Sequence, residues 1–233
     1  MSSPLPDRGH ERSHDPGLRN LTRITLRPIA SPMPLGFYTV AIASTITACL
    51  QLGVFDPGDR RAVALTIVPA FLLQLLVSVF ALGARDVIAA TVMASFAGHW
   101  LANSLVLSAA PPGGPVVLGV LNLVFAVFAV LMVTVMGRRR AVWLVLVVAT
   151  PWFAFSGAYG IVQAAWLGRV AGSIGLVLAV VAMYTAYALM LEELRGKEIL
   201  PVGRHGQAHT AVEGDLADQL RDLERQAGVR RTL

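Results

Sequence analysis

The chain carries PLGFYTVAIASTITACLQLGVF at residues 34–55, and five further apolar stretches of similar length follow it, separated by short breaks. Ten positions between residues 33 and 190 are Asp, Glu, Lys or Arg, and all ten lie at or close to those breaks. A helix of about 20 apolar residues spans the hydrocarbon core of a bilayer, which is about 30 Å thick. The pattern therefore predicts an all-α, polytopic membrane protein with a bundle of six transmembrane helices.

The breaks place the predicted spans. Four of the five breaks are charged (Asp56–Asp59, Arg85 and Asp86, Arg138–Arg140) or rich in proline and glycine (residues 111–115), and both kinds are strong stop signals. All the spans are expected to be helical, because unpaired backbone groups are too costly in lipid. They cover residues 34–55, 62–82, 87–108, 116–136, 141–163 and 166–191.

Three regions are predicted along the chain. They are a disordered cytoplasmic tail at residues 1–30, a six-helix transmembrane transport domain at 31–204 and a cytoplasmic tail at 205–233. Lys and Arg are biased 12 to 3 toward the side that holds both tails, so both termini are predicted to be cytoplasmic. The polar residues before the first apolar run argue against a cleavable signal peptide. We expect a multi-pass protein of the cell (plasma) membrane.

The second tail holds a further helical pattern. Apolar residues recur at steps of three and four from Val212 to Ala227, which predicts an amphipathic helix. This helix either rests on the membrane face or on the cytoplasmic loops, or it forms a short oligomer-forming coil. Two heptads are few for a stable coil.

Several function classes are disfavoured by what the chain lacks. Cys49 is the single cysteine, so no intramolecular disulfide or multi-thiolate metal site is expected. The spans contain no Asp, Glu or Lys, which argues against a fixed carboxylate proton relay. The basic residues lie in tails and loops, as membrane topology requires, so the net charge of +5 does not indicate nucleic-acid binding. We expect neither an enzyme nor a cofactor nor a bound metal.

Small residues recur inside three of the spans. In lipid, helices associate through close backbone approach rather than through the hydrophobic effect. Steps of three and four between small residues predict tight contacts through Gly98 in the third span, Gly160 in the fifth, and Gly172 and Gly175 in the sixth. Some of these faces are candidates for contacts between subunits.

Polar side chains also lie at membrane depth. Ser44 is in the first span, Gln74 in the second, His99 and Asn103 in the third, and Thr150 in the fifth. Such groups are expected to face the interior of the bundle. Two interpretations stay open: hydrogen bonds that hold the helices together, or a polar path through the bundle. Ser and Thr can instead bond back to their own helix.

Short motifs give a more specific indication. Residues 31–36 read Ser-Pro-Met-Pro-Leu-Gly, 95–100 read Ser-Phe-Ala-Gly-His-Trp, 171–176 read Ala-Gly-Ser-Ile-Gly-Leu and 200–203 read Leu-Pro-Val-Gly. The first resembles the Asn-Pro-Ala-Pro-Leu-Gly signature of the acetate uptake transporter family, the succinate–acetate permeases of bacteria and fungi. The others are similar to family segments in the same order, and Gln74 matches a glutamine in the family's second span. The resemblance covers residues 28–204.

The resemblance implies a six-helix protomer, usually within a homo-hexameric ring, that takes up small carboxylates with protons. It implies a constriction at Val40, Phe96 and Thr150. The chain departs from the family pattern at Ser31, which replaces the signature asparagine, and at His99, which replaces an apolar aromatic residue. The predicted substrate path comprises Ser31, Leu35, Gly36, Phe37, Val40, Ser44, Gln74, Phe96, His99, Asn103 and Thr150.

The start of the first span has a physical interpretation of its own. Pro32 and Pro34 hold the chain extended, which leaves backbone N–H groups at residues 35–37 unpaired at a helix N-terminus that favours an anion. A merely rigid start of the helix is the alternative.

Three functions remain open. The first is a permease for acetate or similar small monocarboxylates or succinate. The second is a passive channel for anions or small polar solutes, which counterflow and pH-gradient measurements distinguish from a coupled transporter. The third is a non-transporting membrane scaffold, in which the polar residues tolerate apolar replacement.

Overall fold

The structure is a computed structural model that describes residues 30–136, 140–195 and 199–201. Within these residues every regular element is helical, and no strand occurs. The elements are α1 (Met33–Leu52), the short 3-10 helix η1 (Pro57–Asp59), α2 (Arg60–Gly83), α3 (Val87–Ala109), α4 (Gly114–Val135), α5 (Arg140–Val162) and α6 (Ala165–Arg195).

The helix boundaries lie within four residues of the predicted spans. α1 ends at Leu52, three residues early, because Gly53 adopts a left-handed conformation (φ 76°) whose N–H bonds back to the helix. α6 continues four residues further than predicted, to Arg195. The tails predicted at residues 1–30 and 205–233, including the expected helix from Val212 to Ala227, lie outside the described residues apart from Ala30.

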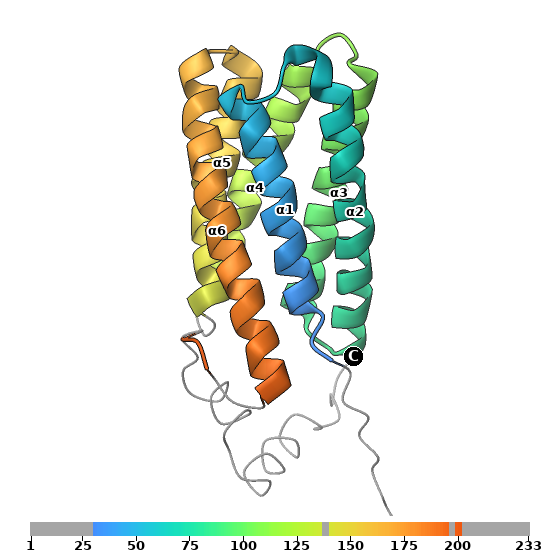
Figure 1. Ribbon diagram of the computed structural model, residues 1–233, viewed down its shortest axis with the longest axis vertical. Coiled ribbons are helices and arrows are strands. Elements are labelled where there is room, and N and C mark those ends of the chain that lie inside the picture. Colours follow the sequence, from blue (N-terminus) through green and yellow to red (C-terminus); the bar gives the residue numbers. More distant parts are fainter. Residues whose placement is uncertain (1–29, 137–139, 196–198, 202–233) are drawn as a thin grey trace, which may run out of the picture.

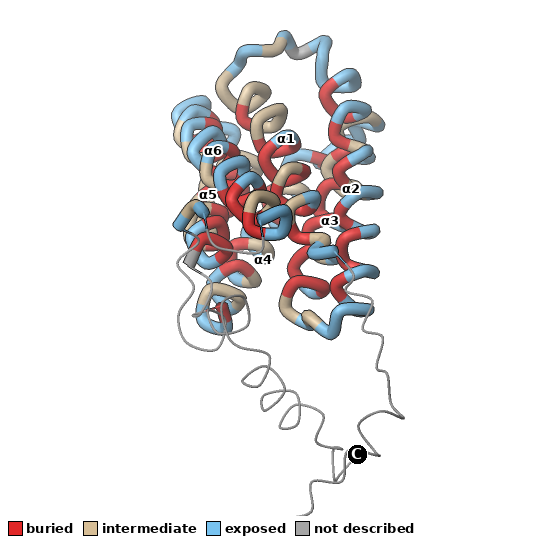
Figure 2. The backbone as a smooth tube through the Cα atoms, turned by 60° about the horizontal axis from the view of Figure 1, so that its bottom comes forward, coloured by how far each residue is buried: buried red, intermediate tan, exposed pale blue. Residues whose placement is uncertain are grey.

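The six α-helices stand side by side in one bundle, with neighbouring helices in opposite directions (Figure 1). α1 packs mainly along α6, α2 along α3, and α4 along α5, while α5 also packs on α6. Buried positions face the interior and exposed positions face outward on each helix (Figure 2). The bundle therefore encloses a central axis to which α1, α3 and α5 contribute buried side chains.

Glycines bring two pairs of helices into close contact. A Cβ built on Gly160 of α5 would lie 2.6 Å from the Pro115 carbonyl oxygen of α4, and one on Gly172 of α6 would lie 2.9 Å from the Ala48 carbonyl oxygen of α1. The close contacts predicted at these glycines are confirmed. Gly98 differs from the prediction: it is exposed, and a Cβ there would meet nothing within 4 Å. Its face of α3 points out of the bundle.

Five of the six α-helices are long and apolar enough to cross a bilayer, which identifies a multi-pass membrane protein. The exception is α3. α3 is 23 residues long, so length does not limit it, but His99, Trp100 and Asn103 lower its hydropathy. Two of these three side chains, His99 and Trp100, are buried inside the bundle rather than exposed on its outer surface.

Candidate functional site

A cavity of about 390 Å³ lies at the end of the bundle where α1, α3 and α5 end and α4 begins, at the top of Figure 1. We call it the upper cavity. Most of its polar lining comes from side chains without a formal charge. The polar residues are Thr47, Gln51, Arg60, His99, Asn103, Asn122, Ser156, Tyr159 and Gln163.

A hydrogen-bond chain joins α1 to α5 in the wall of the upper cavity. The Trp152 indole Nε1 donates to Gln51 Oε1 at 3.3 Å, and Gln51 Nε2 donates to Ser156 Oγ at 2.8 Å. These three residues are not among those predicted to line the path. Gln51 follows Thr47 by one helical turn, so helical spacing was the signal that points to it.

Two predicted residues, His99 and Asn103, lie at the inner end of this cavity. Asn103 Nδ2 donates to the His99 carbonyl oxygen at 2.8 Å and lies 3.1 Å from the His99 ring Nε2. The imidazole is buried, with its ring centroid 4.8 Å from that of Phe125 and 5.1 Å from that of Phe153. His99 and Asn103 therefore lie on one face of α3, and aromatic rings pack against the histidine.

A second cavity, of about 630 Å³, lies at the opposite end of the bundle and is called the lower cavity. It is lined by the start of α1, the turn between α2 and α3, and the end of α6. Ser31 belongs to this lining, and its backbone N–H donates to Glu193 Oε1 at 3.4 Å. The charged residues of the lining are Arg85, Asp86 and Glu193.

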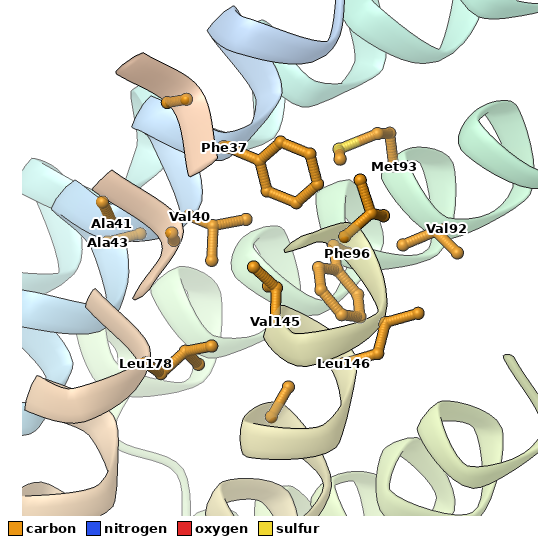
Figure 3. Close-up of a cluster of buried hydrophobic side chains, with 14 of the residues drawn as sticks. Phe37, Val40, Ala41, Ala43, Val92, Met93, Phe96, Val145, Leu146 and Leu178 are labelled. Carbon is orange, nitrogen blue, oxygen red and sulfur yellow. The ribbon is translucent and has the colours of Figure 1, made fainter. Parts of the chain in front are cut away.

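A cluster of buried apolar side chains lies between the two cavities. We call this cluster the barrier. Figure 3 shows Phe37, Val40, Met93 and Phe96 directed toward one another, with Leu146 beside them. Val40 is 1% exposed and Phe96 is 4% exposed, so the barrier is closed to solvent in this conformation.

The third residue of the predicted constriction is placed differently. Thr150 is half-buried, and its hydroxyl donates to the Leu146 carbonyl oxygen of its own helix at 2.9 Å. The α5 ring that packs on Phe96 belongs to Phe153, with 5.6 Å between centroids in an edge-to-face arrangement. Phe153 lies about one helical turn beyond Thr150 on the same helix.

Gln74 is fully buried on α2, and neither of its side-chain amide atoms has a hydrogen-bond partner among the described residues. The position of Gln74 along the bundle axis can be inferred from Val77, which lies beside Gly36 of α1. A Cβ built on Gly36 would lie 3.2 Å from Val77 Cγ1. Because α1 and α2 run in opposite directions, Gln74, one turn before Val77, lies at the level of Val40. The amide is therefore at the depth of the barrier.

Leu35 and Gly36 contribute less to the path than predicted. Leu35 is exposed and lines neither cavity. The Gly36 N–H was expected to be unpaired, but it donates to the Pro32 carbonyl oxygen at 3.3 Å, because Pro32 already has a helical conformation. At Gly36 the prediction of an unpaired donor is therefore wrong.

Ser44 is buried, and its hydroxyl donates to the Ala41 carbonyl oxygen of its own helix at 3.2 Å.

The chain was compared with known proteins. No family model matches it. Acetate permease A of Emericella nidulans is 31% identical to it over 111 residues, which is 47% of this chain and 35% of that protein. The chain therefore matches about a third of the length of this curated relative.

A solved structure shares the fold. The structure described as the bacterial acetate channel SatP superposes with a TM-score of 0.68 at 23% sequence identity, over 76% of this chain and 100% of that one. The sequence match covers about half of this chain, and the structural match covers about three quarters of it. Both similarities support the resemblance of this chain to the acetate uptake transporter family.

Proposed function

We propose that this protein is a permease that carries acetate or a similar small monocarboxylate across the plasma membrane, with all six α-helices spanning the bilayer. The observation that carries the proposal is the pair of cavities at opposite ends of the bundle, divided by the closed barrier around Val40 and Phe96. This arrangement suits a solute that binds from one side and is released to the other. The two relatives are named as a permease and a channel for acetate.

The charges at the two ends support uptake from the upper cavity to the lower cavity. Arg60 is the only formally charged residue among the described residues that line the upper cavity. The lower cavity has two carboxylates, Asp86 and Glu193, beside Arg85. An anion is therefore attracted to the upper cavity and held less strongly in the lower one. The Lys and Arg bias supports a cytoplasmic position for the lower end and for both termini.

Gln74 supports a polar step within the barrier. A buried amide without a hydrogen-bond partner lowers the stability of the fold by about 1–3 kcal/mol. Such a group therefore calls for an explanation, for example a ligand or a water molecule that supplies the missing hydrogen bond. A carboxylate that passes Val40 and Phe96 would accept a hydrogen bond from Gln74 Nε2. Along with Gln74, we propose His99 and Asn103 as polar residues of the path.

Gln74→Leu tests the proposal because it separates transport from stability. We expect uptake of labelled acetate into proteoliposomes to fall by about tenfold or more, the size of a lost hydrogen bond to a charged group. We expect the melting temperature to stay the same or to rise, because the variant removes two unpaired polar atoms. Both quantities are measured on the same preparation.

Ser78→Ala is the matched control, since Ser78 is also buried on α2 but bonds within its own helix to the Leu75 carbonyl oxygen. It should leave uptake unchanged. Uptake equal to that of protein-free vesicles contradicts the permease and favours a scaffold, whereas uptake that is unaltered in Gln74→Leu contradicts the role of Gln74 in the path. Counterflow with and without a pH gradient then distinguishes a proton-coupled carrier from a passive channel.

We also propose a homo-oligomer, hexameric as the family resemblance implies. The exposed side of α4 supports this assembly. α4 is the most apolar of the candidate spans and the least buried within the chain. Its exposed residues include Val117, Val124 and Val127, which are available to lipid or to a neighbouring copy.

A further inference from the structure

We propose that the upper cavity is a binding site for monocarboxylates with an apolar chain longer than that of acetate, of about four to six carbons. The carboxylate would bind at Gln51 and Ser156, and the chain would lie against the aliphatic wall formed by Leu50, Leu107 and Leu118. The inference deepens the proposed function, and it rests on that function for the carboxylate chemistry.

The hydrogen-bond chain from Trp152 leaves donors directed at the cavity. Gln51 Oε1 accepts from the Trp152 indole, and one hydrogen on Gln51 Nε2 is used by Ser156 Oγ. The second amide hydrogen of Gln51 is left over. The Ser156 hydroxyl accepts the hydrogen bond from Gln51 Nε2, but it donates no hydrogen bond among the described residues. The Thr47 hydroxyl, by contrast, already donates to the Ala43 carbonyl oxygen at 2.9 Å. Two neighbouring donors fit the two oxygens of one carboxylate.

These donors are held in place and partly removed from water. Ser156 is 6% exposed, and Gln51 is anchored at both ends of its amide by residues of α5. The indole bond fixes which end of the amide is the oxygen, because an indole N–H only donates. Arg60 at the same cavity supplies one positive charge. A preorganised neutral pair with one cation nearby suits a single negative charge.

One part of the cavity wall is apolar. Leu50, Val106, Leu107 and Leu118 line the same space, and no carboxylate is among the described lining residues. A second carboxylate on the ligand would have to enter this apolar region without a partner, which is costly. A hydrocarbon chain would instead be removed from water there. The wall therefore favours a monocarboxylate with a chain over a dicarboxylate of equal length.

The volume points the same way. Pockets for small organic ligands measure about 300–1,000 Å³, and the upper cavity, at about 390 Å³, lies within that range. Acetate has four non-hydrogen atoms and would leave most of this space to water. A chain of several methylenes would displace that water from Leu107 and Leu118.

Direct binding tests the proposal without any transport step. Acetate, butyrate, hexanoate, adipate and hexan-1-ol are titrated by calorimetry into the full chain in lipid nanodiscs, and empty nanodiscs give the baseline. We expect each added methylene from acetate to hexanoate to tighten binding by about two- to fourfold. Adipate and hexan-1-ol should each bind at least about tenfold more weakly than hexanoate. Equal affinity across the series overturns the proposal.

Two variants locate the ligand. Ser156→Ala should weaken butyrate and hexanoate by about tenfold, while the control Ser78→Ala, which lies on α2 outside both cavities, should bind like the wild type. Leu118→Phe fills part of the apolar region of the cavity, so it should weaken the binding of hexanoate but leave the binding of acetate unchanged. Hexanoate binding that neither Ser156→Ala nor Leu118→Phe weakens, in variants that melt like the wild type, overturns the proposed site.

The two proposals fail in distinguishable ways. Chain-length-dependent binding that depends on Ser156, without acetate uptake, would remove the permease and keep the binding site. Acetate uptake that depends on Gln74, with no preference for longer chains in binding, would keep the permease and remove the inferred site.

Discussion

Gly160 and Gly98 are both helical glycines of the bundle, yet their surroundings differ completely. A Cβ on Gly160 would lie 2.6 Å from the Pro115 carbonyl oxygen and 2.7 Å from Gly119 Cα, while one on Gly98 would meet nothing within 4 Å. The atoms near Gly160 belong to a helix backbone, which cannot rotate away as a side chain can. Close approach of α4 and α5 therefore requires the absence of a side chain at Gly160.

Gly160→Ala should destabilise the protein by about 1–3 kcal/mol, because the added methyl group forces α4 away from α5. The same change at Gly98 should be neutral, or stabilising by up to about 1 kcal/mol through helix propensity. Thermal unfolding of both variants in one detergent measures the difference. A Gly160→Ala variant as stable as Gly98→Ala would contradict the close contact.

Single residues also show what the sequence could and could not predict about the site. His99 and Asn103 were predicted to face the interior of the bundle, and both line the upper cavity. The bonds from Gln51 to Trp152 and Ser156 were missed, because their partners are 101 and 105 positions apart. No local periodicity encodes which helices meet, so contacts between helices needed the fold.

Among the described residues, three in the turns between helices are not glycine and have positive φ: Arg85 at 59°, Ala110 at 43° and Gln163 at 56°. Each follows the end of α2, α3 or α5 and allows a tight reversal. A left-handed conformation brings Cβ close to the backbone, at a cost of about 1 kcal/mol for a residue other than glycine. These turns therefore store strain that glycine would relieve.

Ala110→Gly should stabilise the protein by about 1 kcal/mol, because glycine adopts the left-handed conformation freely. The identical substitution at Ala94, exposed within α3, should destabilise it by about 1 kcal/mol through lower helix propensity. Melting temperatures of the two variants provide the comparison. The same sign for both changes would show that backbone conformation at Ala110 does not limit stability.

At the scale of elements the sequence was informative because hydropathy and breaks define long helices. Every predicted span corresponds to a helix, and the left-handed Gly53 accounts for the early end of α1. α3 was predicted from its uncharged length, although His99 and Asn103 lower its hydropathy below that of the other helices. The polar residues that weaken its membrane signal are those directed at the upper cavity.

The whole molecule has two ends with different charges. The turn between α1 and α2 is predicted to be extracellular, and the turn between α2 and α3 cytoplasmic, from the distribution of Arg and Lys. Gly58 and Ala84 lie in these turns, and both are exposed. A probe that cannot cross the membrane therefore distinguishes the two ends.

Labelling of single cysteines checks this orientation in a Cys49→Ala background, since Cys49 is the single native cysteine. An impermeant maleimide added to intact cells should label Gly58→Cys and leave Ala84→Cys unlabelled. After permeabilisation both should react, which controls for accessibility. Labelling of Ala84→Cys in intact cells, with Gly58→Cys protected, would reverse the orientation and with it the proposed direction of transport.

The length of α6 has a consequence for the bilayer around the lower cavity. Its 31 residues extend about 46 Å at about 1.5 Å per residue, against a hydrocarbon core of about 30 Å. Tyr184 and Tyr187 are exposed on this helix, and such aromatic residues favour the boundary between acyl chains and headgroups. Glu193 then lies beyond that boundary. Anionic phospholipids around the opening of the lower cavity would lower the local concentration of a carboxylate solute. Lipid composition would therefore influence how readily the solute re-enters the lower cavity.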